Sequence, residues 1–116
     1  MTTVLIVDDH GSFRATARKL LEAEGFDVVG EAESGETALE AIERLRPDVV
    51  LLDVQLPDMD GFDVAARLPK NGQRPAVVLT SSRDVSEFRG LVEQCGARGF
   101  VPKDELSGPR IAALLP

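Results

Sequence analysis

Residues 49–61 read VVLLDVQLPDMDG, and this stretch decides which fold the chain can adopt. Its first four residues are aliphatic and two of them are β-branched, which is typical of a strand buried on both faces of a parallel sheet. The run ends on Asp53. Open α/β sheets have their binding and catalytic sites at this position, beyond the C-terminal ends of the strands. The following Pro57 and Asp-Met-Asp-Gly predict a turn into the next helix. A lone acid in this position more often only caps a loop, so the meaning of Asp53 depends on the rest of the chain.

The composition indicates one globular domain. The 116 residues are 43% hydrophobic and 28% charged, which indicates a globular chain that is neither disordered nor membrane-spanning. We expect a cytoplasmic protein, because the apolar block near the N-terminus is too short for a signal peptide and the single cysteine fits a reducing compartment. The net charge of −7 argues against direct binding of this domain to nucleic acid or to an anionic membrane.

Short apolar segments alternate with helical patterns along the whole chain. We expect strands over residues 3–7, 26–32, 48–53, 76–79 and 98–101. We expect helices between Ser12 as N-cap and Gly25, between Ser34 as N-cap and Pro47, over residues 61–68, from Asp84 to Gly96, and from near Pro109. Five strand-then-helix units predict an α/β fold, in which a doubly wound parallel sheet carries helices on both faces. Right-handed crossovers and the chain length favour the flavodoxin-like strand order 2-1-3-4-5.

Polar residues follow the predicted strands at one edge of this sheet. The first and third strands are neighbours in the expected order, so Asp8, Asp9 and Asp53 should converge. Thr80 and Lys103, at the ends of the fourth and fifth strands, should complete the same edge. Any one of these residues has an ordinary structural explanation, but all five at matched strand ends favour a functional site.

Three carboxylates in one place require compensation. Two unit charges 4 Å apart repel by roughly 4 kcal/mol at an effective dielectric of about 20. A single lysine cannot neutralise three acids, so either the pKa values shift or a divalent cation binds. Clustered carboxylate oxygens without histidine or cysteine ligands suit a hard ion, and Mg2+ fits best. We interpret His10 as a turn residue rather than a ligand.

The same residues could carry out phosphoryl transfer. Asp53 would be the nucleophile and would form an acyl phosphate. Mg2+ and Lys103 would balance the charge that builds on the phosphoryl oxygens, and the hydroxyl of Thr80 would donate a hydrogen bond to one of them.

Along essentially its whole length the chain resembles the receiver domain of bacterial two-component response regulators, whose fold is CheY-like. The matching residues are Asp8, Asp9, Asp53, Pro57, Asp60, Gly61, Thr80, Phe100, Pro102 and Lys103. The segments VDDH at 7–10, VVGEA at 28–32 and VPKD at 101–104 are most similar to receivers of the NarL/LuxR type, which carry a helix-turn-helix output domain.

The resemblance implies a role for each residue of the site. Asp53 would be the phospho-acceptor, charged by a phosphohistidine of a sensor histidine kinase or by a small phosphodonor. Asp9, Asp53 and the backbone carbonyl of Gln55 would hold Mg2+, with Asp8 acting through water. The domain would be a switch in signal transduction and not an enzyme, since it would catalyse only its own phosphorylation and dephosphorylation.

The resemblance also implies a switch mechanism. Thr80 and Phe100 would move together, and the small Ser81 would leave the phosphate accessible. A new charge of about −1.5 to −2 would bias a two-state element, the surface of the fourth helix, last strand and last helix. That surface would control an output domain or a partner, or form a homodimer, in transcription regulation. The family often has Tyr where this chain has Phe100.

The last helix is short and no output domain follows within residues 1–116, so we expect one receiver domain, either cut from a longer protein or standing alone. Three other interpretations remain. A receiver-like interaction module would not respond to phosphorylation. A phosphatase of the haloacid-dehalogenase type would use Asp58 and Asp60 of its Asp-x-Asp-Gly, but here that motif lies five residues after the strand. A dinucleotide-binding domain would need a glycine-rich turn after the first strand, where this chain has acids.

Overall fold

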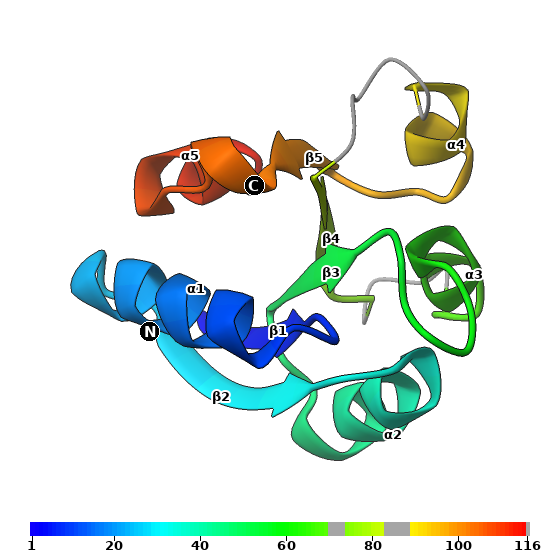
Figure 1. The fold of residues 1–116 in the computed structure, drawn as a ribbon, viewed down its shortest axis with the longest axis horizontal. Coiled ribbons are helices and arrows are strands. Elements are labelled where there is room, and N and C mark those ends of the chain that lie inside the picture. Colours follow the sequence, from blue (N-terminus) through cyan, green and yellow to red (C-terminus); the bar gives the residue numbers. More distant parts are fainter. Residues whose placement is uncertain (70–73, 83–88, 116) are drawn as a thin grey trace.

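The computed structural model describes residues 1–69, 74–82 and 89–115, and it confirms the predicted sheet. Five parallel strands lie in the order β2-β1-β3-β4-β5 (Figure 1). The strands are β1 (Thr3–Val7), β2 (Asp27–Ala32), β3 (Val49–Asp53), β4 (Ala76–Ser81) and β5 (Gly99–Pro102). In the described residues the helices are α1 (Gly11–Ala23), α2 (Gly35–Leu45), α3 (Gly61–Ala66), α4 (Arg89–Gln94) and α5 (Gly108–Ala113), and a 3-10 turn lies at Lys103–Glu105.

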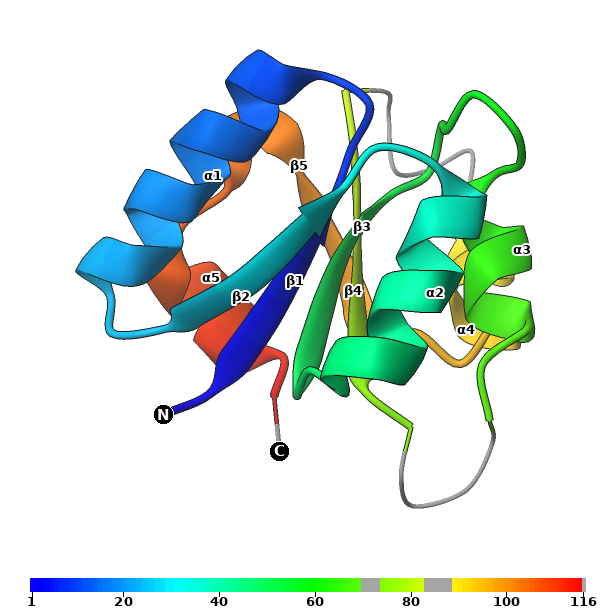
Figure 2. The ribbon, with the colours of Figure 1, turned by 90° about the horizontal axis from the view of Figure 1, so that it is seen from below.

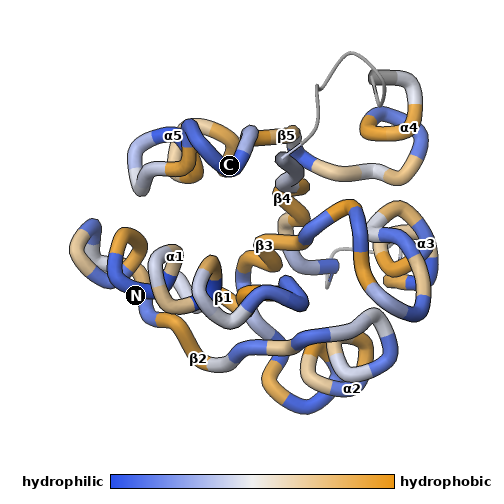
Figure 3. Tube along the Cα trace, in the orientation of Figure 1, coloured by the Kyte–Doolittle hydropathy of each residue, from blue (hydrophilic) through white to orange (hydrophobic). Residues whose placement is uncertain are grey.

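The helices form two layers around the sheet. Helices α1 and α5 cover one face, and α2, α3 and α4 cover the other (Figure 2). Side chains alternate along each strand, so Val4 and Ile6 of β1 pack on the side of α1, whereas Leu5 and Val7 pack on the side of α2. All five residues of β3 are buried, as expected for a central strand, and hydrophobic residues concentrate along the central strands (Figure 3).

The predicted helix boundaries are partly wrong. Helix α1 begins at Gly11 with His10 as its N-cap, so Ser12 lies inside the helix and does not cap it. The reason is that the carboxylate of Asp8 accepts the backbone N–H of His10 at 2.8 Å, which starts the helix earlier. Helix α3 ends at Ala66, two residues before the predicted end, and β4 continues through Thr80 to Ser81.

Other boundaries are confirmed by their capping contacts. The hydroxyl of Ser34 accepts the N–H of Thr37 at 3.2 Å and forms a capping box at the start of α2. Gly25, just after α1, has a φ of 91°, the left-handed conformation expected there. The predicted start of the fourth helix at Asp84 lies outside the described residues.

The described parts of the chain contain no helix with the length and apolar character needed to cross a bilayer.

Gly61 allows the loop after β3 to fold back against the strand. Its N–H donates to the carbonyl of Val54 at 2.7 Å, and a Cβ at this position would lie 2.5 Å from the carbonyl oxygen of Asp53. No side chain can move to relieve that contact, because the clash is with the backbone. Gly61 therefore sets the distance between α3 and the strand that carries Asp53.

We expect Gly61→Ala to lower the free energy of unfolding by about 2 kcal/mol, as overpacking against a fixed backbone typically does. Gly90→Ala is the matched control, because a Cβ there would meet no atom within 4 Å. It should raise the free energy of unfolding by about 0.5 to 1 kcal/mol through helix propensity alone. Urea denaturation followed by circular dichroism measures both, and equal effects of the two substitutions would contradict the close approach at Gly61.

Candidate functional site

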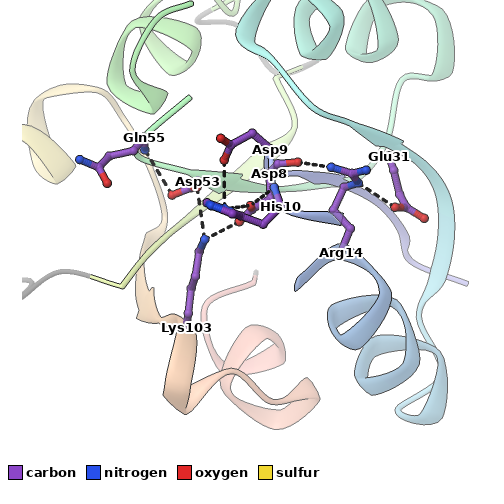
Figure 4. A network of polar contacts seen from close by, with 8 residues as sticks. All are labelled: Asp8, Asp9, His10, Arg14, Glu31, Asp53, Gln55 and Lys103. Carbon is purple, nitrogen blue, oxygen red and sulfur yellow. Dashed lines mark hydrogen bonds and ion pairs between the residues drawn. The ribbon is translucent and has the colours of Figure 1, made fainter. Parts of the chain in front are cut away.

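The structure brings together the acids that follow two neighbouring strands. Asp8 and Asp9 come directly after β1, and Asp53 is the last residue of the adjacent β3 (Figure 4). Ligand atoms of these three carboxylates and of the His10 ring all lie within 4.8 Å of one another. The convergence predicted from the strand order is therefore present in the structure.

Lys103 joins two of these acids. Its Nζ lies 2.6 Å from Oδ2 of Asp8 and 3.3 Å from Oδ2 of Asp53. Both carboxylates are almost completely buried, since the side chain of Asp8 is 0% exposed and that of Asp53 is 4% exposed. Removing Lys103 would leave both buried carboxylates without a compensating charge, so both acids depend on this lysine.

The pKa values of Asp53 and Lys103 are both raised, for different reasons. Burial, followed by repulsion from Asp8, raises the pKa of Asp53 above its usual value, although the N–H of Gln55 and the charge of Lys103 oppose the change. Burial alone would lower the pKa of Lys103, but its hydrogen bond to Asp8 and the charge of Asp53 outweigh that effect and raise it. Lys103 therefore remains a cation at neutral pH.

A second contact positions Lys103. Its Nζ lies 4.6 Å from the centre of the Phe13 ring, on α1, which is within the range of a cation–π interaction. Sequence reasoning missed this contact, because Phe13 fits the apolar face of its helix and nothing local to it indicates a cation.

A small pocket opens above the acids. It is lined by Asp9, His10, Asp53, Gln55, Leu56, Pro57, Ser82 and Lys103. Asp9 is the most exposed of the three acids, with 37% of its side chain accessible. The Gln55 side chain points away from the acids, whereas its backbone N–H donates to Oδ1 of Asp53 at 3.2 Å (Figure 4). A ligand can therefore reach Asp53 from solvent even though the carboxylate itself is buried.

Thr80 and Ser81 lie beside the site on β4. Thr80 pairs in register with Asp53 and is fully buried, and its hydroxyl has no hydrogen-bond partner among the described residues. Ser81 is also buried. Phe100 lies on β5 opposite Leu79 and packs against the core on the side of α2.

Arg14 supports the site from α1, and sequence reasoning assigned it no role. Its guanidinium donates to the backbone carbonyl of Asp8 and pairs with Glu31 of β2 at 3.0 Å (Figure 4). Because Glu31 is 17 residues away, no local pattern could have indicated this pair. The loop that carries Asp8 and Asp9 is thereby tied to both α1 and β2.

The Asp58–Gly61 segment serves to cap helices. The carboxylate of Asp58 accepts the N–H groups of Gly35 and Glu36, at 2.8 and 2.9 Å, and these bonds lower the pKa of Asp58. Asp60 caps α3 by accepting the N–H of Asp63 at 2.8 Å. In a haloacid-dehalogenase phosphatase the first Asp of this motif would end a strand, and here it does not.

The donor set of the pocket fits a metal ion. Asp8, Asp9 and Asp53 offer carboxylate oxygens from two neighbouring strand ends, and one ammonium group leaves their charge only partly balanced. Such a group of oxygens is what a divalent cation requires.

Comparisons with known proteins agree with this geometry. A family model described as "Response regulator receiver domain" matches residues 4–114. The solved "signal receiver domain of the putative response regulator NarL from Mycobacterium tuberculosis" is 37% identical, with a TM-score of 0.85 over 97% of this chain and 95% of that one. A "Putative transcriptional regulator" of Pseudomonas aeruginosa is 40% identical over 105 residues, which are 90% of this chain and 51% of the relative.

Relatives with other names contain the same kind of domain. A "Protein-glutamate methylesterase/protein-glutamine glutaminase" of Alkalilimnicola ehrlichii is 37% identical over 102 residues, 85% of this chain but 26% of that protein. The chain thus spans about half of the regulator and about a quarter of the esterase.

Repulsion among the acids should be measurable as lost stability. We expect Asp53→Asn to raise the melting temperature by a few degrees in EDTA, because it removes one charge from a buried group of carboxylates. For a domain of this size, about 1 kcal/mol corresponds to about 4 °C. Differential scanning calorimetry measures the change, and Asp104→Asn, which removes an exposed acid beside Lys103, should have little effect. An unchanged or lower melting temperature of Asp53→Asn would mean that the acids do not repel one another as argued.

Asp58 should stabilise the protein in a pH-dependent way. We expect Asp58→Ala to lower the melting temperature by a few degrees at pH 7, and Asp58→Asn, which keeps one acceptor oxygen, to lower it less. Since the pKa of Asp58 is lower in the folded chain, its contribution is complete above the ordinary value of 3.8 and is lost as the pH falls through the folded pKa. Melting curves between pH 7 and pH 2 should therefore converge for wild type and Asp58→Ala, and parallel curves would contradict the assignment.

Proposed function

The chain belongs to the response regulator receiver domain family, and we propose that it accepts a phosphoryl group on Asp53 in an Mg2+-dependent reaction. The observation that supports this most directly is the position of Asp53. Its carboxylate lines an open pocket, 3.3 Å from the ammonium of Lys103 and close to two further acids.

The reaction needs an oxygen nucleophile and a leaving group that keeps the electron pair of the bond that breaks. An oxygen of Asp53 attacks the phosphorus of a phosphohistidine or of a small phosphodonor, and the bond from phosphorus to the leaving group breaks. The product is an acyl phosphate. Mg2+, held by Asp9, Asp53 and the backbone carbonyl of Gln55, with Asp8 acting through water, would offset the charge on the phosphoryl oxygens.

Lys103 is suited to bind the transferred group. It is already in contact with Asp53, and its raised pKa keeps it charged throughout the physiological range. A phosphoryl group on Asp53 would offer this ammonium a stronger partner than the carboxylate of Asp8 provides. We expect Lys103 to shift from Asp8 toward the phosphoryl oxygens.

The hydroxyl of Thr80 connects the site to the rest of the domain. It is buried and lacks a partner among the described residues, which is a costly state for a polar group. A phosphoryl oxygen on the neighbouring Asp53 would be an acceptor for it. Movement of Thr80 would then couple to Phe100, while Ser81 keeps the phosphate accessible.

We propose that the readout is the surface formed by α4, β5 and α5. Phosphorylation would change this surface and so control an output domain, a partner or a second copy of the chain. In a longer protein, residues 1–116 would be the receiver, a sensor histidine kinase in the cytoplasm would be the phosphodonor, and transcription regulation would be the output. The domain would act as a switch and would not turn over external substrates.

The phospho-acceptor can be tested by incubation with Mg2+ and acetyl phosphate. Wild type should gain the mass of one phosphoryl group, and amide resonances near Thr80 and Phe100 should shift on phosphorylation or with beryllofluoride. Asp53→Asn should gain nothing, EDTA should suppress the reaction, and the Asp104→Asn control should react like wild type. An unmodified wild type, or equal labelling of Asp53→Asn, would rule out this acceptor. Unmodified wild type would favour an interaction module that is independent of phosphorylation.

A further inference from the structure

His10 lies at the wall of the acidic pocket, although the sequence suggested only a turn residue. Its ring nitrogen Nδ1 is 3.0 Å from Oδ1 of Asp8 and 3.1 Å from Oδ1 of Asp9. The ring is 65% exposed, so it can adjust without disturbing the core. Figure 4 shows the ring among the carboxylates, on the side of the pocket that Asp9 also lines.

Lys103 and His10 contact different carboxylate oxygens of the site. Lys103 contacts Oδ2 of Asp8 and Oδ2 of Asp53, whereas His10 faces Oδ1 of Asp8 and Oδ1 of Asp9. The ammonium and the imidazole therefore do not compete for the same atoms. A dication bound on the imidazole side would leave the contacts of Lys103 in place.

The spacing of the three atoms also fits coordination to one ion. Ligand atoms about 2.1 to 2.2 Å from a metal lie roughly 3.0 Å apart when they occupy adjacent octahedral positions. The nitrogen is at this separation from both oxygens. A dication on this side can bind all three atoms at once, which would give Asp8 a direct contact with the ion in place of the water-mediated contact proposed for Mg2+.

The donor atoms determine which dication the site binds more tightly. Mg2+ prefers oxygen ligands and gains little from an imidazole, whereas Mn2+, Co2+ and the later ions of the first transition series bind imidazole nitrogen well. We propose that Nδ1 of His10 is a ligand of the acidic pocket and shifts its preference from Mg2+ toward a transition-metal dication. This inference rests on the proposed metal site and adds a residue that determines its ion specificity.

The chain allows a direct test, because His10 is its only histidine. Electron spin-echo envelope modulation of Mn2+ bound to the tag-free protein should show a directly coordinated nitrogen that His10→Gln lacks. Titration with Co2+ and Mg2+ should show about tenfold or greater loss of Co2+ affinity in His10→Gln. Substituting even a residue that only hydrogen-bonds to a metal ligand typically weakens metal binding by about tenfold or more. The Mg2+ affinity should change less than about twofold, and Asp53→Asn should weaken binding of both ions.

The possible results separate this inference from the function on which it rests. A nitrogen coupling lost in His10→Gln, together with a selective loss of Co2+ affinity, supports the inference. Unchanged Co2+ affinity in His10→Gln, without nitrogen coupling in wild type, overturns the role of His10 but leaves the metal site standing. If wild type binds no dication, or if Asp53→Asn binds both ions as tightly as wild type, the metal site itself is wrong and both proposals fail.

Discussion

Lys103 holds two buried carboxylates in a place where they would otherwise repel each other, and the rest of the site depends on this contact. Its Nζ reaches Asp8 at 2.6 Å and Asp53 at 3.3 Å, and the Phe13 ring lies 4.6 Å away. One positive charge cannot balance three acids, so the pocket retains an excess of negative charge. That excess suits the pocket to a cation, and after burial, the larger cause, repulsion from Asp8 raises the pKa of Asp53.

The backbone around the site is fixed from several directions, which limits how far the acids can separate. Arg14 binds the carbonyl of Asp8 and links it to β2 through Glu31. On the other side, Asp58 ties the loop after Asp53 to the start of α2, and Gly61 lets that loop approach the strand. These contacts hold the charged groups to neighbouring elements, so in the proposed function a change of charge at Asp53 would be met first by side-chain movement. Thr80 and Lys103 are adjacent to Asp53 and are the groups that we propose would move.

The proposed function would oppose stability in this pocket. Burying acids costs free energy, and an apolar strand end would fold more stably. The same burial removes water from Asp53 and strengthens the electrostatic contacts made to it. Next to Asp53 lies Thr80, whose buried hydroxyl has no hydrogen-bond partner among the described residues. Such local costs are expected where a domain must respond to a new charge.

The sequence alone determined the fold class, the strand order and the edge of the sheet where Asp8, Asp9, Asp53, Thr80 and Lys103 lie. It could do so because buried parallel strands are continuous apolar runs and their C-terminal ends share one edge. Only the tertiary structure decided which atoms meet: Lys103 with Oδ2 of two acids, His10 with Oδ1 of two acids, and Arg14 with Glu31. Those contacts join residues on different strands and helices, so they follow from packing and rotamers, and no local pattern contains them. The start of α1 was mispredicted for the same reason, since a carboxylate side chain and not the local capping preference of Ser12 sets it.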